Sequence, residues 1–186
     1  MTEGEDRKTV EAVLRGERAA YAVLVDRYKD RVFNLAYRMT GRFSDADDLT
    51  QEAFIRAYVN LSRFETEKSF FTWLYTISLN TVRNHLKKRN RDFIDNAVEW
   101  AEHVAAGAGP AASDPEGDMN ERQLQELLQE CLLRLPLDTR EAVILRFYQD
   151  LSFEETAEIL GISLSAAKMR VYRGLEKLKE GLSKKG

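Results

Sequence analysis

One stretch of the sequence, Phe70 to Arg91, carries side chains suited to binding single-stranded nucleic acid. One side of it, read at helical spacing, holds Trp73, Thr76, Asn80, Arg83, Asn84 and Lys87, which we call the single-strand face. A flat ring can stack on bases, hydroxyls and amides can bond base edges, and cations can follow phosphates. A core helix with a solvated basic end is the plainer alternative, and this stretch alone does not separate the two.

The same stretch predicts a long helix, because it contains no glycine or proline to break it. Its other side carries Phe71, Tyr75, Ser78, Val82 and Leu86 at spacings of three and four. Such a stripe packs on neighbouring helices, so the helix would be fixed by one side and free to bind by the other.

An acid-rich segment, Asp45 to Leu61, precedes this helix. Its first turns hold Asp45, Asp47, Asp48, Gln51 and Glu52. Acids at a helix start are stabilised by the macrodipole, which is one sufficient reason for them. Four acids in eight residues without a base favour a second reading, an acidic surface that docks on a basic partner. Gly41 and Ser44 are predicted to end the preceding helix and to cap this one.

The C-terminal part predicts a helix-turn-helix. Ser152 and Glu155 match a capping box, Gly161 turns the chain, and Ser163 can cap the last helix. The exposed side of that helix would carry Ser165, Lys168, Met169, Arg170 and Arg173, and residues 163–186 hold seven basic and two acidic groups. Helix pairs of this shape also occur in proteins that bind no nucleic acid, but the basic face favours DNA binding.

The composition predicts an all-α protein, and because no catalytic triad, metal-binding cluster or phosphate-binding loop motif is found, we expect no enzyme activity, metal or cofactor. The 186 residues are 44% hydrophobic with only three prolines, and no apolar run approaches the length of a membrane span. Cys131 is the single cysteine and the two histidines are far apart, so neither a disulfide nor a zinc site is expected. The polar N-terminus lacks a signal-peptide core, and we expect a cytoplasmic protein.

The charge pattern divides the chain. Residues 93–120 contain six acidic and no basic side chains, and 105–118 are rich in small residues, proline and glycine. We therefore predict two small helical domains, 1–92 and 120–186, joined by a flexible acidic linker at 93–119.

In three segments the chain resembles the two-domain bacterial sigma factors of the extracytoplasmic-function group. The segments are DADDLTQEAFIRAY (45–58), SFFTWLYTISLNTVRNHL (69–86) and LPLDTREAVILRFYQDLSFEETAEILGISLSAAKMRVYRGLEKL (135–178). The resemblance implies a sigma-2-like domain and a sigma-4-like domain. It implies binding to core RNA polymerase and promoter-specific transcription initiation.

The resemblance also implies roles for particular residues. The clamp helices of the largest polymerase subunit would be contacted by Asp45, Asp48, Leu49, Gln51 and Glu52. The single-strand face, together with Phe64 in the 62–69 loop, would capture the melted −10 element, with Asn80 near a flipped base. The −35 duplex would be contacted by Ser165, Lys168, Met169, Arg170 and Arg173. Ala166, Ala167, Met169 and Gly174 depart from the family pattern, which leaves the −35 sequence preference open.

Two other readings remain at this stage. A stand-alone helix-turn-helix repressor or activator would bind duplex alone, but it gives no reason for the acid-rich segment. A protein whose helices bind a regulator is compatible with the sigma reading, since the resemblance implies control by an anti-sigma factor.

Overall fold

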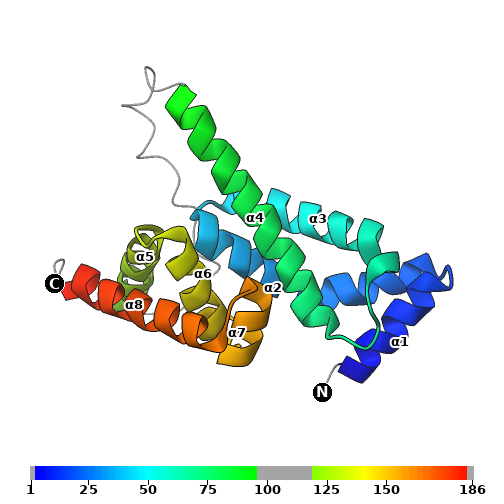
Figure 1. The fold of residues 1–186 in the computed structure, drawn as a ribbon. Helices are drawn as coiled ribbons and strands as arrows, with labels where there is room; N and C mark the ends of the chain where they lie inside the picture. The colour runs from blue at the N-terminus through cyan, green and yellow to red at the C-terminus, as the bar shows by residue number, and fades with distance from the viewer. Residues whose placement is uncertain (1–2, 96–118, 184–186) are drawn as a thin grey trace.

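The computed structural model describes residues 3–95 and 119–183, and every regular element in those ranges is helical (Figure 1). The N-terminal half contains α1 (Glu3–Leu14), η1 (Arg18–Ala20), α2 (Tyr21–Thr40), α3 (Phe43–Asn60), η2 (Leu61–Arg63) and α4 (Phe70–Asp95). The C-terminal half contains α5 (Met119–Leu133), α6 (Leu137–Val143), η3 (Ile144–Tyr148), α7 (Phe153–Leu160) and α8 (Leu164–Ser183). The all-α prediction is confirmed. The predicted linker lies almost wholly outside the described residues.

Helix α4 is the long rod predicted from its sequence, and it crosses the middle of the molecule (Figure 1). Phe70, Leu74, Leu79 and Val82 are buried against α2 and α3. Tyr75 is fully buried as well. Burial of this apolar stripe holds α4 in the bundle and orients the rest of its circumference.

The connection between α2 and α3 confirms one expected cap and corrects the other. Gly41 ends α2 in the left-handed conformation, with φ of 72°. Helix α3, however, begins at Phe43 after an extended Arg42, so Ser44 lies inside the helix and its predicted role as the cap was wrong. The acidic Asp45 stands in the first turn instead, where it complements the helix dipole.

The predicted helix-turn-helix is formed by α7 and α8. The capping box is present: Glu155 N donates to Ser152 Oγ at 3.1 Å, and Ser152 N donates to Glu155 Oε2 at 2.8 Å. Gly161 makes the turn with φ of 66°, and Ser163 Oγ accepts from Ala166 N at 3.2 Å.

Gly174 has a low helix propensity, but its lack of a side chain lets α8 pack closely against α6. A Cβ built on it would lie 2.3 Å from Val143 Cγ2 and 3.1 Å from Thr139 Cγ2. Helices α6 and α8 therefore approach each other more closely than any side chain at this position would allow.

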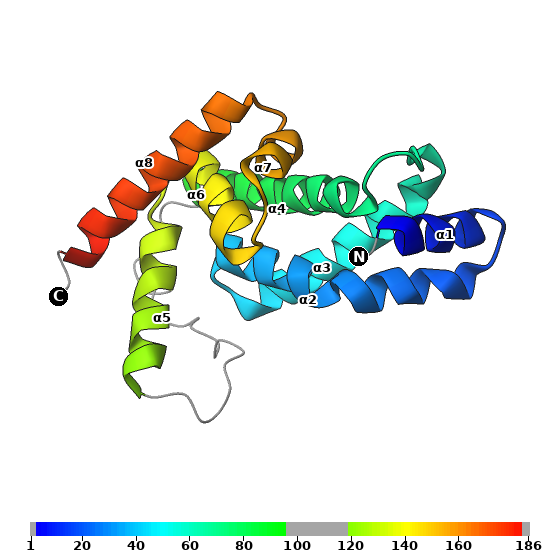
Figure 2. The ribbon, with the colours of Figure 1, turned by 90° about the horizontal axis from the view of Figure 1, so that it is seen from below.

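The two halves lie against each other (Figure 2), and buried apolar side chains from both form one continuous hydrophobic core. Helix α5 and η3 contact α2, and α7 contacts α4. The buried Gln149 joins both halves, because Tyr75 Oη donates to its Oε1 at 2.6 Å and its Nε2 donates to Arg31 O at 3.3 Å. The described parts of the two halves thus form one packed body.

Candidate nucleic-acid and polymerase interfaces

The predicted single-strand face lies along α4, on the side away from the buried stripe. Asn80, Asn84 and Lys87 are exposed, whereas Trp73 and Thr76 are partly buried. The Thr76 hydroxyl donates to Thr72 O at 2.9 Å and so faces its own helix. The face therefore offers two amides and one lysine directly to solvent.

Phe64 lies beneath the start of this face. It is 7% exposed, and its ring centroid lies 5.1 Å from that of Trp73 and 5.7 Å from that of Phe70. The loop before α4 is therefore anchored to the helix by an aromatic cluster. In this arrangement Phe64 supports Trp73, and the exposed part of the Trp73 ring is what a base could reach.

Arg83 was assigned to the single-strand face from the sequence, but in the structure it forms an ion pair with Glu141 of the C-terminal half. Its Nε and Nη2 donate to the two carboxylate oxygens of Glu141, each at 2.6 Å, and its Nη1 donates to Asn80 Oδ1 at 3.1 Å. The hydrogen bonds to Glu141 raise the pKa of Arg83 above its ordinary value. The guanidinium is thus fully charged and held in one orientation.

The acid-rich segment divides into exposed and inward-facing residues. Asp48, Gln51 and Glu52 are exposed on α3. Leu49 is 3% exposed and packs in the core, so it is not available as a surface contact in this structure. Asp45 is held against α4, with its Oδ2 3.1 Å from Arg89 Nη1 and 3.3 Å from His85 Nε2.

Sequence reasoning missed two apolar side chains on the same surface. Ile55 is 63% exposed and Val59 is 71% exposed, and they follow Glu52 along α3. Their signal was present, since both fall outside the apolar stripe of this helix at a spacing of four. Exposed apolar residues that lie next to each other form a patch that a partner can cover.

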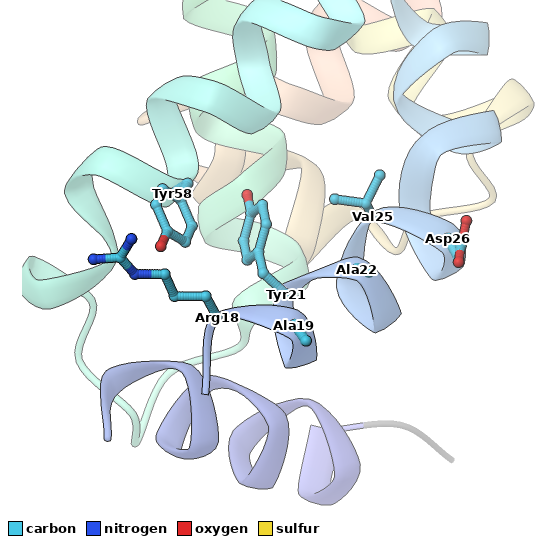
Figure 3. Close-up of a pocket in the computed structure, with 7 residues that line it drawn as sticks. All are labelled: Arg18, Ala19, Tyr21, Ala22, Val25, Asp26 and Tyr58. Atoms are coloured by element: carbon cyan, nitrogen blue, oxygen red, sulfur yellow. The ribbon is translucent and has the colours of Figure 1, made fainter. Parts of the chain in front are cut away.

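Tyr58 is 39% exposed and lies at the edge of an open hollow between α3 and the start of α2. Figure 3 shows its ring beside Tyr21 and the Arg18 side chain; the two rings meet edge to face at 5.0 Å. Tyr21 Oη donates to Phe54 O at 2.8 Å, and burial raises the pKa of Tyr21. This hydroxyl therefore joins α2 to α3.

The exposed side of α8 carries most of the residues predicted to contact DNA. Ser165, Lys168, Met169 and Arg173 are exposed, and Met169 is 51% exposed. Arg170 is partly buried, with Nε 3.7 Å from Asp138 Oδ2 on α6. Lys168 Nζ lies 5.7 Å from the centroid of Phe153. The helix therefore presents a mixed face of one hydroxyl, one thioether and three cations.

The described residues, 3–95 and 119–183, contain neither a candidate metal site nor a membrane-spanning helix. No group of three or more histidine, cysteine or acidic side chains there could hold a metal ion. None of the helices in those ranges is both long enough and apolar enough to cross a membrane.

Comparisons with known proteins match both halves of the chain. The Sigma-70 region 2 family model matches residues 24–92, and the Sigma-70 region 4 family model matches residues 125–178. The chain is 36% identical over 179 residues to the ECF RNA polymerase sigma factor SigW of Bacillus subtilis (strain 168), covering 95% of this chain and 96% of SigW. It is 35% identical over 175 residues to the ECF RNA polymerase sigma-E factor of Escherichia coli (strain K12), covering 92% of this chain and 91% of that protein.

Solved structures share the fold. The sigma factor RpoE of Bartonella quintana, in complex with the anti-sigma factor NepR, has a TM-score of 0.72 and 24% identity over 88% of this chain and 96% of that chain. CnrH, in complex with the cytosolic domain of CnrY, has a TM-score of 0.70 and 24% identity over 97% of this chain and 99% of that chain.

Proposed function

Because the chain belongs to the extracytoplasmic-function (ECF) sigma factors, we propose that it binds core RNA polymerase and directs promoter-specific transcription initiation. One observation carries the proposal: a single chain presents an acid-rich helix, a long helix with exposed amides and cations, and a helix-turn-helix with a basic face. A polymerase specificity subunit needs all three surfaces, whereas a stand-alone duplex binder needs only the last. Sigma factors are initiation factors and not catalysts, so we assign this chain no reaction of its own.

The surface of α3 is the docking site for the polymerase. Asp48, Gln51 and Glu52 supply exposed acidic and polar contacts to the clamp helices, and Ile55 with Val59 supplies apolar area beside them. Charge attraction speeds and orients docking, while burial of the apolar groups stabilises the complex. Asp45 and Leu49 act indirectly, because their contacts with α4 and with the core fix the position of α3.

The two DNA elements are contacted by different halves. The single-strand face of α4, supported by Phe64, captures the melted −10 strand, and α8 enters the major groove at −35. Residues 1–92 and 120–186 are accordingly the two functional domains, with 93–119 as the acidic linker between them. Because core polymerase and the bacterial chromosome lie in the cytoplasm, the chain would act there.

We also propose that an anti-sigma factor regulates the chain, which is supported by the RpoE–NepR complex that shares this fold.

The test is transcription by bacterial core RNA polymerase across a pool of promoter sequences, with and without the chain. We expect transcripts only when the chain is present, from templates enriched in two separated elements. Absence of initiation, together with tight duplex binding by the chain alone, would instead establish a stand-alone repressor or activator.

A further inference from the structure

The contact between Arg83 and Glu141 joins a residue assigned to the DNA with a residue of the other half. Glu141 belongs to α6, and its side chain is 2% exposed, whereas that of Arg83 is 23% exposed. Two parallel N–H···O bonds of 2.6 Å make the pair bidentate. This is the geometry in which a guanidinium also binds a phosphate.

Glu141 can form the ion pair with Arg83 only while the two halves are packed together. The packing around the pair depends on α7, which lies against α4 (Figure 2). It also depends on Gln149, which accepts from Tyr75 Oη and donates to Arg31 O. Separation of the halves would break the ion pair and leave the Arg83 guanidinium open to solvent. A carboxylate as buried as Glu141 is stable only when it is paired. The pair and the closed packing therefore support each other.

We propose that Glu141 is an intramolecular competitor for the DNA strand at Arg83, so that closed packing of the halves and capture of the −10 strand exclude each other. This inference rests on the proposed function, in which the single-strand face binds melted DNA. Either a carboxylate or a phosphate can fill the fork of the guanidinium, but not both at once. The free chain then binds single strands weakly, because only its open fraction is competent.

The competition gives the polymerase a role in exposing the DNA site. A partner that binds α3 and the C-terminal half at separated positions favours the open state and releases Arg83. Asn80 is affected together with Arg83, since its Oδ1 accepts from Arg83 Nη1 in the closed form. Strand capture is thereby confined to the polymerase-bound factor.

The test uses the full chain with Glu141→Gln and a matched control, Glu158→Gln. Glu158 is an exposed acid on α7, so both variants lose one negative charge from the same half. Small-angle X-ray scattering measures the radius of gyration, and fluorescence anisotropy measures binding to a labelled single-stranded oligothymidine. We expect Glu141→Gln to expand the chain and to tighten binding about fivefold or more, while Glu158→Gln changes neither by as much as about twofold.

A second variant separates competition from a general loss of structure. Arg83→Glu combined with Glu141→Arg restores the ion pair in reverse, and we expect a compact chain that binds the oligonucleotide more weakly than the wild type. Circular dichroism confirms that each variant keeps its helices.

Unchanged size and affinity in Glu141→Gln, relative to Glu158→Gln, would overturn the competition, as would an expanded chain whose strand affinity does not rise. These outcomes are distinct from failure of the proposed function, which is a failure of the wild-type chain to support initiation by core polymerase.

Discussion

At the scale of single residues, the cations assigned to DNA differ in whether the folded chain already engages them. Arg83 is bound by Glu141, and Arg170 lies 3.7 Å from Asp138. Arg173 is exposed and has no ion-pair partner among the residues that the structure describes. A guanidinium in that situation can contact a base edge or a phosphate without first losing another contact.

Replacing Arg173 by alanine should weaken promoter use by about 1–3 kcal/mol if this residue reads a base. The reason is loss of a charge-assisted contact in the −35 groove, and the measurement is transcription from a set of promoters that differ at −35. Lys177→Ala, another exposed position on α8, is the control. A loss that is equal on every promoter would contradict base reading and mark Arg173 as a phosphate contact.

At the scale of elements, α8 is shaped by Gly174 as much as by its charged face. Helix propensity alone favours alanine over glycine by about 1 kcal/mol. The contact with Val143 opposes this, because a Cβ at Gly174 would lie 2.3 Å from Val143 Cγ2. For Gly174→Ala, helix propensity therefore predicts a higher free energy of unfolding, whereas packing predicts a lower one.

We expect Gly174→Ala to lower the free energy of unfolding by about 1–3 kcal/mol, since overpacking of a tight helix contact outweighs the propensity gain. Urea denaturation measures the change. Combining Gly174→Ala with Val143→Ala should recover part of the loss by removing the methyl group that clashes. A more stable Gly174→Ala variant would show that α6 and α8 are free to move apart.

Helix α3 is the element on which the polymerase assignment depends. Replacing Asp48 and Glu52 by lysine should weaken binding to core polymerase at least tenfold, because close pairs of opposite charge are replaced by like charges. The matched control is Glu154→Lys with Glu158→Lys, which reverses two exposed acids at the same spacing on α7. Affinity is measured with labelled chain and core polymerase without DNA. Equal losses in both double variants would remove α3 from the docking site.

At the scale of the whole molecule, Arg140 fastens the C-terminal half to the end of α2. Its guanidinium donates to Met39 O at 2.8 Å, to Leu135 O at 3.1 Å and to Leu133 O. Burial lowers the pKa of Arg140, while these carbonyl oxygens solvate its charge. Nearby, Leu133 fills the space above Gly41, where a Cβ would lie 2.5 Å from Leu133 Cδ1.

Arg140→Ala should therefore destabilise the molecule by about 2–3 kcal/mol, because it leaves buried carbonyl oxygens without a donor. Calorimetry should show a melting temperature lower by roughly 5 °C or more. Arg134→Ala is the control, since its side chain is 68% exposed and only weakly paired with Glu130. A wild-type melting temperature in Arg140→Ala would show that the halves are not held together by this contact.

Local sequence signals predicted the structure correctly at most positions where neighbouring residues decide the backbone conformation. The capping box at Ser152, the left-handed glycines Gly41 and Gly161, and the apolar stripe of α4 all formed as predicted. The cap predicted at Ser44 was wrong because α3 begins at Phe43, two residues before the first helical residue that a cap at Ser44 implies. The predicted contact residues keep the helices assigned to them, but their exposure could not be read from spacing.

By itself, the sequence determined the helical class, the order of the elements and the family, because these follow from periodicity, capping residues and motifs within short windows. Only the tertiary structure decided which charged and polar side chains are free. Arg83, Asp45 and Arg140 each have a partner from a distant part of the chain, which for Arg83 is Glu141, 58 residues away. Such pairs are set by how the helices pack, and helix packing depends on shape and burial across the whole molecule instead of on the spacing within any one segment.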